Sequence, residues 1–113
     1  MNVSFKGFNE KVLTFKCETK ITKGYGVKIT DNQTVGNCNE GDAFTGFCLD
    51  SDNENATVQM SGYVKMNYSD TAPALGKNAL VFAADGTVQE NAAGTPCTVL
   101  AVDENTSTVE FLF

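Results

Sequence analysis

The run from Ala56 to Met66 alternates small or apolar residues with polar ones over eleven positions. Side chains of a β-strand point to opposite faces at period two, whereas the apolar positions of a helix recur at 3.6. A two-residue hairpin at Ser61-Gly62 would place apolar residues beside polar ones on the same face. We therefore predict one long half-buried strand with a bend or bulge at Gly62. Its length is typical of a strand that crosses a barrel corner or passes between two sheets.

Most of the remaining chain divides into short strand-like runs, separated by clusters of Gly, Asn, Asp and Pro. These runs cover 11–18, 26–30, 33–37, 43–49, 79–84, 87–90, 97–102 and 106–113. Both faces of the 43–49 run are apolar, which indicates a strand in the middle of a sheet. The longest irregular segment, 67–78, contains Pro73 and Gly76 and is a candidate functional loop.

The dipeptide Asp85-Gly86 favours a two-residue type I′ hairpin, because this turn requires positive φ at both central positions. Such a turn would pair Ala84 with Thr87 and Ala83 with Val88. No segment predicts a helix beyond a single turn at 91–93. About nine short antiparallel strands, spaced near ten residues apart, predict a small all-β barrel or sandwich with little or no helix.

The composition limits both the size of the fold and its chemistry. A length of 113 residues accommodates one domain, 1–113, with 1–10 as a candidate N-terminal arm. The chain contains no His, no Arg and no Trp, so the usual general base, the common neutral metal ligand and the bidentate anion clamp are missing. We therefore expect neither enzymatic activity nor a cofactor. The net charge of −6 argues against nucleic acid and anionic membranes as partners.

The charges are unevenly distributed along the chain. Residues 1–28 hold six lysines and two acids, a balance of +4, whereas residues 29–113 hold two lysines and twelve acids, a balance of −10. The basic stretch could dock on an acidic surface of another copy or of a larger assembly. The alternative is a solvated strand face that bears lysines.

The four cysteines are Cys17, Cys38, Cys48 and Cys97. No targeting or membrane-spanning segment is visible, so we expect a cytoplasmic protein whose thiols are reduced. Without a CxxC pair or a His, a metal site is not expected. The apolar parity around Cys17 and Cys97 predicts buried core thiols. A Cys38–Cys48 disulfide is an alternative under oxidising conditions only.

The acidic run around Asp52 has the first spacings of a calcium-binding loop. Asp50, Asp52 and Glu54 match, but Asn55 stands where such a loop has Gly, and Ser61 where it has Glu. The run therefore predicts a solvated loop.

Glycine turns and apolar strands follow one another in a definite order along nearly the whole chain. They are Thr22-Lys23-Gly24-Tyr25-Gly26, Val27-Lys28-Ile29, Glu40-Gly41-Asp42, Phe44-Thr45-Gly46, the alternating strand ending in Val64, Leu75-Gly76-Lys77-Asn78, Ala79-Leu80-Val81-Phe82 and Val109-Glu110-Phe111-Leu112-Phe113. This pattern resembles that of the small capsid decoration proteins of tailed bacteriophages, and the related head fibre proteins have a similar succession of strands and turns. Four cysteines and many asparagines depart from the family pattern.

The resemblance implies a structural protein that binds the outside of an assembled phage or prophage head and reinforces it against internal DNA pressure. Its partner would be the major capsid protein, and it would form a homo-oligomer, with a trimer favoured. It would be made in the bacterial cytoplasm and end on the virion head surface. We expect the capsid contact at Phe5, Lys6, Phe8, Lys11 and the loop around Pro73.

The C-terminal aromatic residues have a different expected role. Phe111 and Phe113 share a face of the last predicted strand, which favours a place in the core or in a subunit interface.

The alternative function is a small bacterial β-barrel module that binds carbohydrate or peptide. Sugar sites are often lined by aromatic platforms. The absence of Trp, with only Tyr25, Tyr63 and Tyr68, argues against a sugar ligand.

Overall fold

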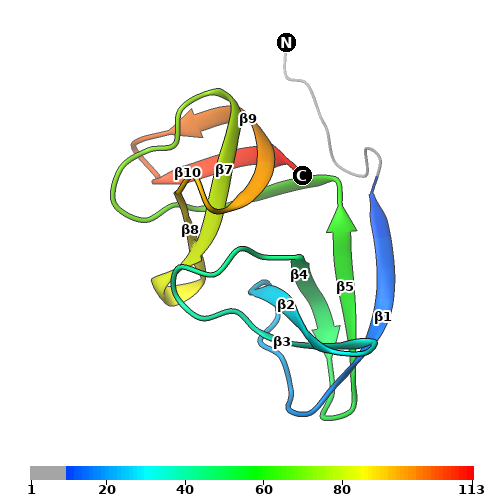
Figure 1. Cartoon of the computed structure of the whole chain (residues 1–113). Coiled ribbons are helices and arrows are strands. Elements are labelled where there is room, and N and C mark those ends of the chain that lie inside the picture. Colours follow the sequence, from blue (N-terminus) through cyan, green and yellow to red (C-terminus); the bar gives the residue numbers. More distant parts are fainter. Residues whose placement is uncertain (1–9) are drawn as a thin grey trace.

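The computed structural model describes residues 10–113, and these residues form an all-β fold in two lobes (Figure 1). The first lobe contains β1 (Lys11–Cys17), β2 (Gly26–Asp31), β3 (Thr34–Asn37), β4 (Gly46–Ser51) and β5 (Asn55–Ser61). The second contains β6 (Tyr63–Asn67), β7 (Gly76–Ala83), η1 (Ala84–Gly86), β8 (Thr87–Glu90), β9 (Thr95–Asp103) and β10 (Thr108–Leu112). The predicted all-β class is confirmed, with ten strands and one short 3₁₀ turn in the described residues.

The five strands of the first lobe close into a barrel in the order β1-β3-β2-β4-β5, and the others form an open sheet in the order β6-β10-β9-β7-β8. All strand pairs in both lobes are antiparallel except β1 with β3, which is parallel. The prediction of purely antiparallel strands is therefore wrong at this one pair. The connection after β1 is held at the barrel by Ile21, whose side chain is 2% exposed and whose N–H donates to Ser51 Oγ at 3.0 Å. This connection carries the chain past the position next to β1, so that β2 lies one strand away and β3 fills the place between β1 and β2.

Gly62 marks the passage of the chain from the barrel to the sheet. Its φ of 117° lies where residues with a side chain are strained, so the alternating run of 56–66 breaks into β5 and β6. The prediction of one continuous strand is wrong, but its expected passage between two sheets is confirmed. Gly62 and Phe113 exchange two backbone hydrogen bonds of 3.1 Å each, so the C-terminus lies beside the junction.

The hairpin between β7 and β8 exists where Asp85-Gly86 predicted it, but its register is different. Ala83 pairs with Thr87 and Phe82 with Val88, across the three residues of η1. The predicted two-residue turn is therefore wrong. The observed register brings Phe82 and Val88, both buried, to directly opposed positions, which the predicted pairing of Ala83 with Val88 would not do.

The buried hydrophobic residues of the described chain, 10–113, form two clusters, one centred on the open sheet and one inside the barrel. β4 contributes to both, because Phe47 belongs to the cluster of the sheet and Cys48 to the cluster inside the barrel. This confirms that both faces of the predicted 43–49 strand are apolar, although β4 itself begins only at Gly46. β4 also pairs with β2 on one side and β5 on the other, as expected of a central strand.

Phenylalanine rings join the lobes. Phe47 lies 6.1 Å from Phe111 and 5.3 Å from Phe113, between ring centroids, and Phe44 lies 5.8 Å from Phe113. Two of these contacts are edge-to-face, a favoured geometry for aromatic pairs. The barrel and the sheet therefore share part of one core.

Gly46 provides a test of the closeness of β4 and β5. A Cβ at this position would lie 2.7 Å from Val58 Cγ1 and would also clash with the main-chain oxygen of Gln59. We expect Gly46→Ala to lower the free energy of unfolding by about 1–3 kcal/mol or more, since a strand backbone must move. Urea unfolding measures the effect.

The control is Gly36→Ala, whose Cβ would meet only the side chain of Thr30, an exposed residue that can move. It should cost less than Gly46→Ala. Equal stability of the wild type and Gly46→Ala would contradict the described packing.

Candidate functional site

Within residues 10–113, β1 has one edge without a strand partner over most of its length. It pairs with β5 from Lys11 to Lys16, but with β3 only at Lys16 and Cys17. The side chains of Val12 and Leu13 are 43% and 54% exposed, and Lys11 and Lys16 are exposed as well. We call residues 11–16 the β1 edge. An exposed strand edge offers free N–H and C=O groups to another chain.

A second surface lies on the open sheet, in a groove between the loop 72–75 and residues 100–105 at the end of β9 and in the turn after it. Leu75 is 68% exposed, the highest value of any large hydrophobic side chain in residues 10–113. Of the described residues, the charged ones that line the groove are Asp103 and Glu104, and none is a lysine. We call this surface the acidic groove.

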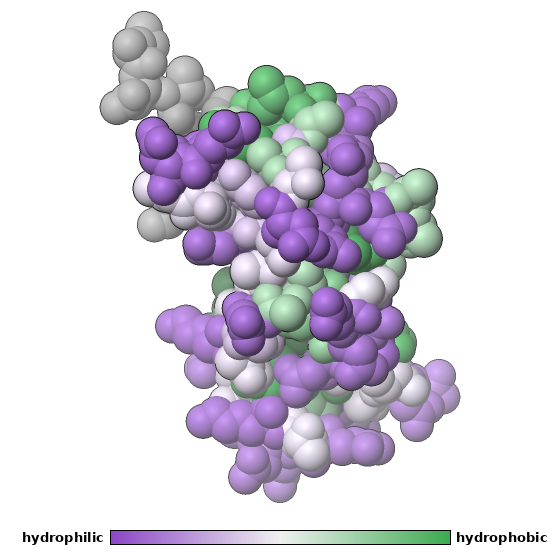
Figure 2. Space-filling model, turned by 90° about the vertical axis from the view of Figure 1, so that its left-hand side faces the viewer, coloured by the Kyte–Doolittle hydropathy of each residue, from purple (hydrophilic) through white to green (hydrophobic). Residues whose placement is uncertain are grey.

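The hydropathy of the surface differs between the lobes. Figure 2 shows the face that lies on the left of Figure 1, where the 68–75 loop and the turn between β9 and β10 project. Apolar atoms gather at its upper end, over the open sheet, whereas polar atoms cover most of its lower end, over the barrel. The sheet lobe thus presents the more apolar part of this face.

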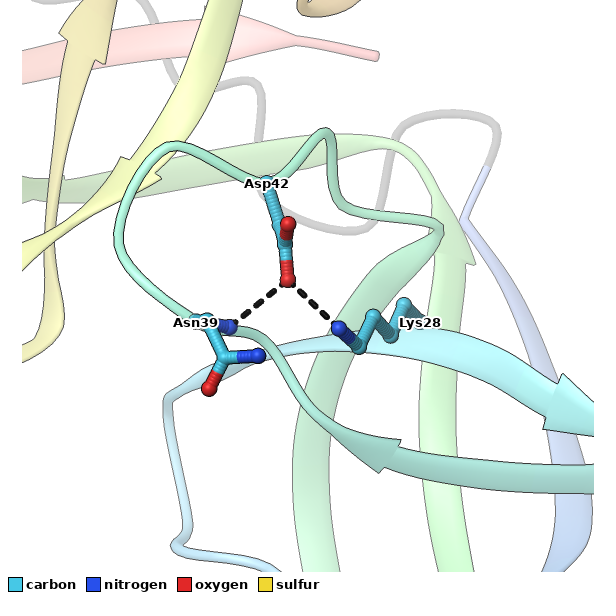
Figure 3. Close-up of polar contacts among 3 residues, drawn as sticks. All are labelled: Lys28, Asn39 and Asp42. Atoms are coloured by element: carbon cyan, nitrogen blue, oxygen red, sulfur yellow. Dashed lines mark hydrogen bonds and ion pairs between the residues drawn. The ribbon is translucent and has the colours of Figure 1, made fainter.

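A polar cluster of Lys28, Asn39 and Asp42 fixes the connection between the lobes (Figure 3). Lys28 Nζ donates to Asp42 Oδ2 at 2.7 Å, and the Asn39 backbone N–H donates to the same oxygen at 2.8 Å. The main chain of this turn bonds to β7, because Gly41 N–H donates to the Phe82 oxygen and Phe82 N–H to the Asp42 oxygen, both at 2.8 Å. The cluster therefore ties β2 of the barrel to a turn that is itself attached to the sheet.

The ion pair shifts the pKa values of both partners. The hydrogen bond from Lys28, together with the one from Asn39, lowers the pKa of Asp42, and the same contact with Asp42 raises the pKa of Lys28. Both side chains are 33% exposed, so water screens the pair and its effect on stability is modest. This arrangement positions a turn and leaves both groups charged at neutral pH.

All four cysteines are buried thiols, as the sequence predicted. Burial raises the pKa of Cys38 to about 11 and that of Cys97 to about 12, and it also raises the pKa of Cys48. Cys38 belongs to the cluster of the sheet and Cys48 to the cluster of the barrel. Thiols with raised pKa values are poor nucleophiles, since the thiolate is the reactive form.

Tyr25 and Tyr63 make contacts within the fold. The Tyr25 ring packs on Phe82 at 5.5 Å between centroids. The Tyr63 hydroxyl donates to Glu110 Oε1, and burial together with this carboxylate raises the pKa of Tyr63 to about 12. These rings therefore contribute to packing within the fold.

Within residues 10–113, no group of three or more His, Cys, Asp or Glu is placed to hold a metal ion. Asp52, from the calcium-like run, accepts the backbone N–H groups of Glu54 and Asn55 at 2.7 and 2.8 Å, which closes the hairpin turn between β4 and β5. Over the same described range, none of the helical structure is long and apolar enough to span a bilayer.

The predicted contact residues have different positions. Phe5, Lys6 and Phe8 lie outside the described residues, and Lys11 is exposed at the start of β1. Pro73 is buried but lines the acidic groove, and the expected contact through the loop around it stays a prediction.

The two C-terminal phenylalanines are core residues to different degrees. Phe111 is completely buried in the cluster of the sheet, which favours the core over the subunit interface among its two expected places. Phe113 is partly buried and packs against the same cluster.

Leu75 is the contact candidate that the sequence analysis did not select. Its signal is a large apolar residue in an irregular segment between Pro73 and Gly76, with no strand periodicity to bury it.

A scan against protein-family models matched none of them, and a search of curated proteins found no significant match.

Removal of the Asp42 charge tests the polar cluster. We expect Asp42→Asn to lower stability at neutral pH. A carboxyl with a lowered pKa stabilises the fold above its unfolded pKa, so the difference from wild type should close as pH falls from the ordinary value of 3.8 through the lowered pKa. Urea unfolding from neutral pH to about pH 2 measures it.

Asn39→Ala is the matched control, because the backbone N–H remains and the Asn39 side chain points away from Asp42 in Figure 3. It should leave the pH dependence unchanged. A difference between Asp42→Asn and wild type that persists at the lowest pH would contradict the assigned ion pair.

Thiol labelling tests the burial of the cysteines. At about pH 8, Cys38 and Cys97 of the folded protein should react with a thiol reagent far more slowly than after unfolding in urea, because burial and a raised pKa both disfavour the accessible thiolate. Asn53→Cys, at an exposed position, should add one fast-reacting thiol as a control. Fast reaction of the native Cys97 would contradict its placement.

Proposed function

We propose that this protein is a non-enzymatic structural protein that binds the outer surface of a phage or prophage capsid and stabilises it. The observation that supports this most is the exposed β1 edge, a surface suited to contact between proteins, which directly follows the N-terminal segment expected to contact the shell, with Phe5, Lys6 and Phe8. Together these residues form a continuous stretch of chain with apolar and basic side chains. Its partner would be the major capsid protein.

The β1 edge supports contact with another protein in two ways. Its free backbone groups can hydrogen-bond an added strand, a common mode of protein recognition. The exposed side chains of Val12 and Leu13 add apolar area, and Lys11 and Lys16 add positive charge. Charge of this kind favours encounter with an acidic surface.

The construction of the two lobes also suits a structural role. A shared phenylalanine cluster and the turn at Asp42 join the barrel to the sheet, so a load applied to one lobe passes to the other. Many copies on a symmetric shell multiply weak individual contacts. Assembly would take place in the bacterial cytoplasm, and the protein would remain on the virion head.

A second candidate function is a small bacterial β-barrel module that binds a peptide. The acidic groove favours it, because exposed Leu75 beside Asp103 and Glu104 matches a peptide with apolar and basic residues. A peptide array would identify such a ligand, and binding to peptides without binding to capsids would favour this second candidate.

The double change Phe5→Ser and Phe8→Ser tests capsid binding. Purified protein is added to phage heads produced without its gene, and bound protein is measured after sedimentation. We expect the affinity to fall by about tenfold or more, since a loss of about 1.4 kcal/mol of apolar contact has that effect. The thermal unfolding midpoint should remain nearly unchanged.

Asn2→Ser, a polar change in the same segment, is the control and should bind like wild type. A large fall in the thermal midpoint of the double variant would place the two phenylalanines in the core and contradict the assigned contact. Failure of the wild type to sediment with heads would contradict the proposed function itself.

A further inference from the structure

We propose that copies of this protein associate head to tail, with the β1 edge of one copy docked into the acidic groove of the next. This interface gives the β1 edge a neighbouring copy as its partner and leaves the contact with a shell to the N-terminal segment that carries Phe5, Lys6 and Phe8. It can be measured on the isolated protein, so it stands or falls independently of capsid binding.

The first argument is the position of the exposed apolar side chains. Across residues 10–113, the large hydrophobic residues that remain exposed are Val12, Leu13 and Ile29 in the barrel lobe and Leu75 in the sheet lobe, and of these all but Ile29 lie on the β1 edge or in the acidic groove. The chain thus leaves apolar area uncovered on both lobes, in a molecule that extends 40 Å along its longest axis. If the apolar area on the barrel lobe of one copy contacts the apolar area on the sheet lobe of the next, both areas are buried and no other partner is needed.

The second argument is charge. Lys11 and Lys16 flank Leu13 at the β1 edge, whereas Asp103 and Glu104 lie in the acidic groove beside Leu75. Asp103 Oδ1 accepts the N–H of Asn105 at 2.9 Å, so this carboxylate already makes a hydrogen bond within its own turn. The exposed Glu104 is the better acceptor for a lysine of a neighbour.

Charge also decides between two modes of association. In an isologous dimer the same patch meets itself, so two β1 edges would bring lysines together and two acidic grooves would bring carboxylates together. Like charges at an interface are unfavourable. The heterologous contact of edge with groove pairs opposite charges, and repetition of such a contact generates a ring or a filament.

A complementation experiment tests this arrangement by sedimentation velocity. Leu13→Asp disrupts the edge and keeps the groove, while Leu75→Asp disrupts the groove and keeps the edge. We expect wild type to form oligomers, each variant alone to be monomeric, and an equimolar mixture to form a heterodimer, because one intact edge and one intact groove remain. Thermal unfolding checks that both variants are folded.

Ile29→Asp is the control, since Ile29 is 49% exposed in the barrel lobe but lines neither surface. It should assemble like wild type. A mixture that stays monomeric, a wild type that is monomeric at high concentration, or variants that assemble like wild type would each overturn the proposal.

Charge reversal gives a second test with changes that the fold tolerates easily. Lys16→Glu and Glu104→Lys should each weaken association, and the two together in one chain should restore it, because the opposite charges are exchanged across the interface. The restored assembly should again weaken at high salt, as screening predicts. Failure of the double variant to recover would overturn the pairing of these residues.

Discussion

The contact of Phe47 with Phe111 and Phe113 is the interaction on which the rest of this structure depends. β4 belongs to the barrel, yet it directs Phe47 into the core of the sheet, where the ring packs against both C-terminal phenylalanines. Because Phe113 also bonds to Gly62 through the backbone, the end of the chain closes the junction that Gly62 opens. The β1 edge and the acidic groove therefore keep fixed positions relative to each other.

Much of the fold follows from local patterns in the sequence. The period-two alternation of apolar and polar residues predicted most of the strands, and the two apolar faces of 43–49 predicted a central strand. Both signals reflect which side chains the sheet buries. The β7–β8 register was predicted wrongly because Asp85 and Gly86, both with positive φ, lie in a three-residue loop. The parallel β1–β3 pair joins two strands that β2 separates along the chain, with Ile21 of the intervening connection buried in the barrel, and no local pattern contains such long-range contacts.

The candidate site was less accessible to sequence reasoning. Lys11 was expected on the surface and lies there, but Pro73 is buried and Leu75 takes the exposed position in its loop. Exposure in an irregular loop depends on how the loop rests on the sheet, which residue type alone does not determine. The acidic groove likewise combines the 72–75 loop with the end of β9 and its turn, more than 20 positions away in the sequence.

The proposed role gives each surface a separate task. The N-terminal segment contacts the shell, while edge and groove link neighbouring copies, so that contacts too weak to act singly become strong through repetition.

The most direct measurement is mass spectrometry of density-purified, DNA-filled particles from cells that carry the gene. The account predicts peptides of this chain in stoichiometric proportion to the major capsid protein. Their absence from filled particles would contradict it.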